Sequence, residues 1–167
     1  MSSLPKPRPL ASLLAEAWYA EEVKTVLRMS AAETTRLGHR YIGGEHLLIA
    51  AVASDTPTGA VLRDFGATVA QVRSRVEFIV PHEPTVLALA GGDVRIGPRL
   101  LARLEDEAEI AQASDARVSL SDVLLALLRD REGLPTRVLD ECGVDTRALV
   151  VRLRLFRESA AHLSTEH

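Results

Sequence analysis

The sequence predicts an all-α fold, a tandem pseudo-twofold repeat of two four-helix units with one extra N-terminal helix. Apolar residues recur with a period of 3.6 along several segments, and glycine or proline ends those segments. A shift of 77 residues superposes the two halves without a gap. The predicted boundaries are an N-terminal extension at 1–18, a first repeat at 19–80, a linker at 81–95, a second repeat at 96–157 and a tail at 158–167.

The composition limits the class of protein. A chain of 167 residues, 47% of them hydrophobic, corresponds to one domain with a real core. The single Cys142 excludes a disulfide framework and a multi-cysteine metal site. Twenty basic and 23 acidic residues give a net charge of −3, which argues against a basic nucleic-acid binder. Neither Lys6 nor Lys24 follows a glycine, so the chain has no Walker A loop.

The same features predict where the protein works. The apolar run 47–53 is too short to span a membrane. The proline-rich start at 1–9 has no apolar region typical of a signal peptide. We therefore expect a cytoplasmic protein that binds neither a membrane nor nucleic acid.

The helices of the first half follow from their apolar stripes. The stripe of the first helix includes Val23, Val26 and Leu27, and Gly38 ends it. Three further helices are expected at 45–53, at 59–65 before Gly66, and at 69–79. An extra amphipathic helix is expected at 10–20, outside the repeat and just before the first repeat helix, where it could occupy a binding groove of the domain.

The second half repeats these features in one register. Leu27 falls on Leu104, and the helix-ending Gly66 falls on Gly143. Between the halves, the linker contains two adjacent glycines at 91–92 between apolar runs. They are compatible with a two-residue hairpin or with an irregular crossover loop.

The stretch 37–48, L-G-H-R-Y-I-G-G-E-H-L-L, resembles the signature of the Clp amino-terminal (Clp repeat) domain. In the second half, Ile96 to Arg99 resembles the family's F-T-P-R, and 121–125 takes the place of T-E-H-[IL]-L. The resemblance covers about residues 19–157. It implies an all-helical recognition domain of the type found in front of ClpA- and ClpC-type AAA+ unfoldases, here without the ATPase modules.

The resemblance also implies a ligand site in each repeat. In Gram-positive ClpC-type domains, the motif glutamate contacts the guanidinium of phosphorylated arginine, and nearby hydroxyl and N–H groups hold the phosphate. The matching acidic residues here are Glu45 and Asp122, and the family threonine is replaced by Gly44 and Ser121. Carboxylates pair bidentately with guanidinium groups. Both acids also fit a purely structural role in the first turn of a helix.

A second surface implied by the resemblance is the apolar groove that binds cyclic-peptide antibiotics in actinobacterial ClpC. Its matching positions include Leu27, Ile96, Leu104 and Glu105. Ile96 replaces the family phenylalanine and Leu101 replaces a lysine, so the groove departs from the family pattern. Leu27 fits the core better than the groove, because it lies on the buried stripe of its helix.

The motifs give no support for an enzyme. His39 and His46 lack the spacing of a metal-binding helix pair, and Cys142 aligns with Phe65 as a small core residue. We expect no cofactor, no metal and no catalytic residue.

The predicted function is a non-enzymatic protein- or peptide-binding module that recognises substrates, adaptors or components of Clp proteolysis, including phosphoarginine proteins. The alternative is a decoy that sequesters adaptors or cyclic-peptide antibiotics.

Overall fold

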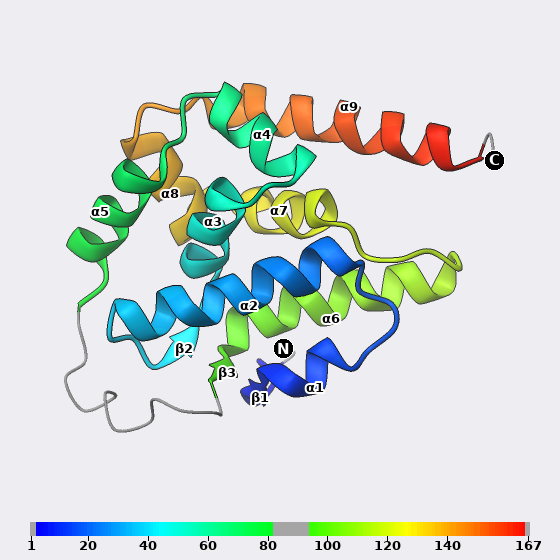
Figure 1. The fold of residues 1–167 in the computed structure, drawn as a ribbon, viewed down its shortest axis with the longest axis horizontal. Helices are drawn as coiled ribbons and strands as arrows, with labels where there is room; N and C mark the ends of the chain where they lie inside the picture. The colour runs from blue at the N-terminus through cyan, green and yellow to red at the C-terminus, as the bar shows by residue number, and fades with distance from the viewer. Residues whose placement is uncertain (1–2, 82–93, 166–167) are drawn as a thin grey trace.

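The computed structural model describes residues 3–81 and 94–165 and is built almost entirely of helices (Figure 1). The described part contains nine helices and three two-residue strands. The helices are α1 (Leu10–Leu14), α2 (Glu21–Arg36), α3 (Gly44–Ala53), α4 (Pro57–Asp64), α5 (Val69–Ile79), α6 (Pro98–Ala113), α7 (Leu120–Arg129), α8 (Leu134–Glu141) and α9 (Thr146–Thr165). The strands are β1 (Arg8–Pro9), β2 (Tyr41–Ile42) and β3 (Arg95–Ile96). The all-α tandem architecture is confirmed, and the glycines at 91–92 lie outside the described residues.

The tandem repeat is visible in the helix positions. Helices α2, α4 and α5 start at residues 21, 57 and 69, and α6, α8 and α9 start 77 residues later, at 98, 134 and 146. Helix α7 starts at 120, one residue earlier than the shift from α3 requires. Within each half the first two helices pack together, α2 on α3 and α6 on α7. The fourth helices differ in length, because α9 continues unbroken to Thr165.

Glycines end three of these helices with a left-handed backbone. Gly38, Gly66 and Gly143 have φ angles of 67°, 92° and 84°. This conformation is strained for residues with a Cβ atom, so glycine fixes the place where each helix stops. The equivalent Gly66 and Gly143 therefore give α4 and α8 the same length.

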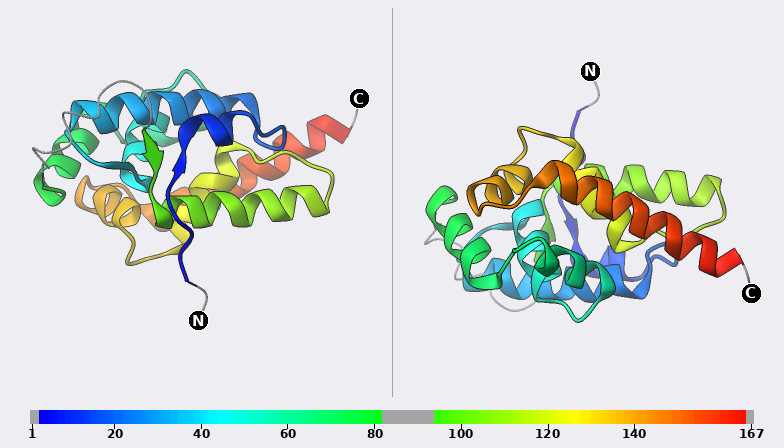
Figure 2. Two further views of the ribbon diagram at one scale, coloured as in Figure 1. Left: turned by 90° about the horizontal axis from the view of Figure 1, so that it is seen from below. Right: turned by 90° about the horizontal axis from the view of Figure 1, so that it is seen from above.

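A small sheet links the two repeats and the N-terminal segment. Its order is β1-β3-β2, so β3 lies in the middle. Strand β2 pairs with it in parallel and β1 pairs with it antiparallel. Figure 2 shows β1 and β3 side by side between α2 and α6. The sequence does not predict these strands, because two residues are too few for a period-two pattern.

The extra N-terminal helix is present but shorter than predicted. It covers Leu10–Leu14 instead of 10–20. The following segment turns and becomes extended: Val118 N–H donates to the Trp18 carbonyl at 2.7 Å, and Ala20 N–H donates to the Val118 carbonyl at 3.0 Å. The bridge between Tyr19 and Val118 thus replaces the predicted helical turns.

One core spans both halves, and the halves meet at equivalent positions. The Thr58 hydroxyl lies 3.2 Å from the Ser121 hydroxyl, and both residues are buried. The 77-residue shift carries Gly44 onto Ser121 and Thr58 onto Pro135. Correspondingly, a Cβ atom on Gly44 would lie 2.9 Å from the Pro135 ring. The contact between these two repeat positions therefore occurs twice. Thr58 and Ser121 form it with polar groups, and Gly44 and Pro135 form it with apolar groups.

Candidate functional site

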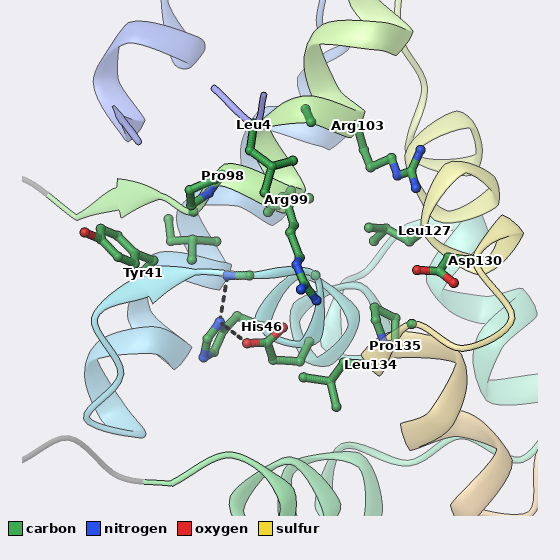
Figure 3. A pocket seen from close by; sticks show the side chains of 18 of the residues that line it. Leu4, Tyr41, His46, Pro98, Arg99, Arg103, Leu127, Asp130, Leu134 and Pro135 are labelled. Carbon is green, nitrogen blue, oxygen red and sulfur yellow. Dashed lines mark hydrogen bonds and ion pairs between the residues drawn. The ribbon is translucent and has the colours of Figure 1, made fainter. Parts of the chain in front are cut away.

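A cavity of about 780 Å³ lies where the two repeats meet. Its walls come from the start of α3, the first turns of α6 and the connection between α7 and α8 (Figure 3). Glu45 and Gly44, two of the predicted site residues, line it together with Arg99, Leu127 and Pro135. The volume is in the range of pockets that hold small ligands or single peptide side chains.

Glu45 contributes a largely buried carboxylate to this cavity. Its side chain is 16% exposed. The carboxylate folds back over Gly43: a Cβ atom on that glycine would lie 2.5 Å from Oε2 of Glu45. Burial raises the pKa of Glu45 above its ordinary value, although a hydrogen bond with the residue's own backbone acts in the opposite direction. Glycine at position 43 therefore leaves room for this carboxylate beside the backbone.

His46 stands next to Glu45 but does not neutralise it. The Gly43 N–H donates to Nδ1 of His46 at 2.9 Å, so Nδ1 carries no proton. Nε2 of His46 lies 2.7 Å from Nδ1 of His39, and this hydrogen bond leaves the proton of His46 on Nε2. Burial, with the neighbouring His39, lowers the pKa of His46 to about 3. The 3.6 Å approach of Glu45 to Nδ1 is therefore no ion pair at neutral pH. Within the described residues no other cation lies within ion-pair distance of Glu45.

Charged residues of both signs line the cavity that contains this carboxylate. Arg99 extends into the cavity from the first turn of α6, and Arg103 lies one turn later (Figure 3). Asp106 and Asp130 line the same cavity. The site can therefore receive a ligand in which a cationic group and an anionic group lie close together.

In the second repeat, the carboxylate of Asp122 caps the N-terminus of its own helix, α7. Asp122 accepts a hydrogen bond from the Ser119 N–H at 2.9 Å, and its own N–H donates to the Ser119 hydroxyl at 3.1 Å. These two bonds form a capping box at the start of α7. Asp122 also lies 3.4 Å from the guanidinium of Arg157. Ser121 is buried against Thr58. Neither Asp122 nor Ser121 lines the large cavity.

The predicted apolar groove is filled by the protein itself. Ile96 and Leu104 are fully buried, as is Leu27. The Tyr19 hydroxyl donates to the Leu104 carbonyl at 3.0 Å, and Ile96 pairs with Arg8 in the sheet. In this conformation Ile96 and Leu104 offer no surface to a ligand. Glu105 is on the surface, 3.5 Å from the guanidinium of Arg8.

The cavity residues that the sequence does not single out as site residues include Arg99, Pro135 and Leu127. Arg99 lies inside the motif at 96–99, but the motif alone assigns it no role. Pro135 is the repeat counterpart of Thr58, and following that pairing would have pointed to it. Leu127 carries no signal beyond its place on a buried helix.

Other candidate chemistry is weak in the described ranges. No group of three or more histidine, cysteine or acidic residues there could hold a metal ion. Cys142 is partly buried against the core, and burial raises the pKa of its thiol. Across residues 3–81 and 94–165, none of the helices is both long enough and apolar enough to cross a bilayer.

Several solved structures share this fold. The N-terminal domain of ClpD from Arabidopsis thaliana superposes with a TM-score of 0.66 at 19% identity, covering 84% of this chain and 96% of that one. The N-domain of ClpV from Vibrio cholerae gives 0.62 at 19% identity, covering 93% of both chains. A ClpV N-domain in complex with a VipB peptide gives 0.59 at 17% identity, covering 89% of this chain and 91% of that one. At these identities the similarity establishes the fold alone.

Sequence relatives point to the same group of proteins. The chloroplastic chaperone ClpC of Pisum sativum is 30% identical over 145 residues, which are 85% of this chain and 15% of the relative. ClpB of Oceanobacillus iheyensis is 31% identical over 150 residues, 86% of this chain and 18% of the relative. The chain thus spans less than a fifth of these relatives. The family profile described as the Clp repeat (R) N-terminal domain matches residues 19–142. The chain therefore belongs to the Clp repeat N-terminal domain family.

Proposed function

We propose that the protein is a non-enzymatic module that binds protein segments for a Clp-type proteolytic system, at the cavity that contains Glu45. Family membership supports this, and so does the ClpV N-domain, which has the same fold and was solved with a VipB peptide. The cavity lies between the repeats, so both halves of the domain contact a bound side chain.

The observation that carries the proposal is the buried carboxylate of Glu45, which has no cationic partner among the described residues. A buried charge without a partner is costly, and a bound cation removes that cost. Guanidinium fits best, because its planar donors pair bidentately with a carboxylate. The module therefore recognises an arginine side chain.

Arg99 adds the second half of the specificity. Its side chain enters the cavity that holds Glu45 (Figure 3). A free arginine would meet this positive charge, whereas a phosphorylated arginine would offer it a phosphate. The ligand that satisfies both Glu45 and Arg99 is phosphoarginine, displayed on a protein or peptide. Arg99 contacts the phosphate in place of the family's threonine hydroxyl, because Gly44 at that position has no side chain.

Isothermal titration calorimetry tests this with phosphoarginine, arginine and inorganic phosphate as ligands. We expect phosphoarginine to bind most tightly. Glu45→Gln should weaken it at least tenfold, which corresponds to about 1.4 kcal/mol. Asp122→Asn is the matched control in the other repeat and should leave the affinity within about twofold. Because burial raises the pKa of Glu45, guanidinium binding should release a proton and strengthen as the pH rises above 4.5.

Two results would overturn the proposal. One is the absence of any heat with phosphoarginine, and the other is equal affinity in wild type and Glu45→Gln. A parallel titration with a cyclic-peptide antibiotic tests the decoy role: tight binding of the antibiotic without binding of phosphoarginine would favour it.

A further inference from the structure

The outer edge of β3 is occupied by the chain's own N-terminal segment. Arg8 and Pro9 form β1 and pair antiparallel with Ile96 and Arg95. The Leu10 N–H extends the pairing by donating to the Val94 carbonyl at 3.0 Å. Proline at position 9 has no N–H, so this short strand adds to the edge with few backbone bonds. A segment held this way can be displaced by another extended peptide.

The side chain of Arg8 fixes this segment in place. Its Nη2 lies 2.6 Å from Oε1 of Glu16, its Nη1 lies 3.5 Å from Oε1 of Glu105, and its Nε donates to the Ser12 hydroxyl at 3.2 Å. Glu16 follows α1 and Glu105 belongs to α6, so both carboxylates would remain if residues 3–9 moved away. Together they form an acidic receptor for one arginine next to a strand edge.

The first described residues continue from this strand toward the cavity. Leu4 lies at the cavity wall near Arg99 (Figure 3), and this residue is 55% exposed. The segment between Leu4 and Arg8 carries Lys6 and two prolines. It therefore has the composition of an extended basic peptide lying across an acidic docking edge.

We propose that the β3 edge, with Glu16 and Glu105, is a docking site for extended, arginine-containing peptide segments of other proteins, and that residues 3–9 occupy it as a tethered competitor. The arginine of the incoming segment takes the place of Arg8, and its backbone takes the place of β1. This site is separate from the Glu45 carboxylate and needs no phosphate, so it does not depend on the proposed phosphoarginine binding. The tether sets an effective concentration of order millimolar that an incoming peptide has to overcome.

Fluorescence anisotropy of a labelled peptide with the sequence of residues 3–10, Ser-Leu-Pro-Lys-Pro-Arg-Pro-Leu, tests the proposal on the full chain. Arg8→Ala releases the tethered segment, and we expect this variant to bind the peptide at least tenfold more tightly than wild type, since the competitor is weakened. Lys6→Ala is the matched control from the same segment and should behave like wild type. In the Arg8→Ala background, Glu105→Gln should weaken peptide binding several-fold. Glu109→Gln, one turn later on α6, should not.

Equal peptide affinity in wild type and Arg8→Ala would overturn the proposal, and so would equal effects of Glu105→Gln and Glu109→Gln. A measurement on wild type keeps the test valid if Arg8→Ala fails to fold. The amide hydrogen of Leu10 should exchange faster as unlabelled peptide is added, because the chain's own bond to the Val94 carbonyl is lost. Unchanged protection at about 10 mM peptide, several times the effective concentration of the tether, would contradict displacement.

Discussion

Glu45 and Asp122 occupy equivalent positions in the two repeats, but their carboxylates have different neighbours. Asp122 accepts a hydrogen bond from the Ser119 N–H and faces Arg157. Glu45 folds over Gly43, faces a cavity and lies 3.6 Å from His46, which is neutral at pH 7. The acid of the second repeat caps its helix, whereas the acid of the first repeat is the one that we propose binds a ligand.

The residues before each helix explain this difference. The second repeat has Ser119 at the N-cap, whose hydroxyl completes a capping box with Asp122. The first repeat has Gly43 there, and His46 takes the capping role by accepting the Gly43 N–H. Because His46 forms this cap, Glu45 does not take part in capping α3. The two repeats thus use different residues to cap equivalent helices, and the proposed binding role of Glu45 rests on this exchange.

The largest predicted effect concerns this histidine. The folded pKa of His46 is about 3, against 6.5 for the free side chain. The unfolded chain therefore takes up the proton first, so stability is complete above pH 6.5 and falls as the pH decreases toward 3. The total loss is on the order of 5 kcal/mol.

His46→Val, which installs the equivalent Val123 of the second repeat, tests this contribution. Urea unfolding at several pH values should show a variant that is less stable at pH 7.5 by about 1–3 kcal/mol, because the Gly43 N–H loses its acceptor. The gap to wild type should close as the pH falls. Parallel pH profiles for the two proteins would contradict the capping role of a neutral His46.

The next effect is a difference between Asp122 and Glu45 in their contributions to the free energy of unfolding. Asp122→Ala should lower the free energy of unfolding by about 2 kcal/mol, because it removes half of a capping box and an ion pair. Glu45→Ala is the matched change in the first repeat and should not lower it. Thermal or urea unfolding at pH 7 measures both. Equal losses would show that both acids have a structural role.

A smaller effect of opposite sign is expected for Glu45→Gln. Burial raises the folded pKa of Glu45 above 4.5, so the folded state holds its proton longer than the unfolded state does. Stability contributed by this group is therefore lost as the pH rises from 4.5 through the folded pKa of Glu45. The uncharged glutamine lacks this loss and should make the free protein slightly more stable at pH 7. A less stable variant would mean that the carboxylate has a cationic partner.

The smallest effect is expected for Arg157→Ala. Its side chain is 43% exposed and lies 3.4 Å from Asp122. Exposed pairs of this kind contribute about 0.2–1 kcal/mol. The loss should therefore be well below that of Asp122→Ala and should diminish in high salt. An equally large loss would shift the role of Asp122 from the cap to the ion pair.

The sequence predicted most of the fold, because the repeat and the helix-ending glycines act locally. Gly66 and Gly143 mark the same helix end in both halves, and the structure confirms it. The strands escaped prediction because β3 is defined by its partners from distant parts of the chain. The helix predicted at 10–20 is interrupted for the same reason, by the bridge between Tyr19 and Val118.

The candidate site was only partly predictable. Glu45 and Gly44 line the cavity, as the motif suggested they should lie together. The different fate of Asp122 depends on the Ser119 side chain, which a motif comparison treats as one more loop residue. The family resemblance predicts Ile96 and Leu104 in a groove, but the N-terminal segment and Tyr19 cover that region. A local cap therefore decides the role of Asp122, whereas contacts from distant parts of the chain decide the burial of Ile96 and Leu104.

The doubled contact between the halves has a consequence for how this domain can evolve. Gly44 faces Pro135 on one side, and Thr58 faces Ser121 on the other. A protein assembled from two copies of the first half would set glycine against threonine and leave a gap. Two copies of the second half would press serine against proline. The two halves are therefore not interchangeable, and recombination between them is disfavoured. A substitution at Gly44 requires a matching change at Pro135, and one at Thr58 requires a matching change at Ser121.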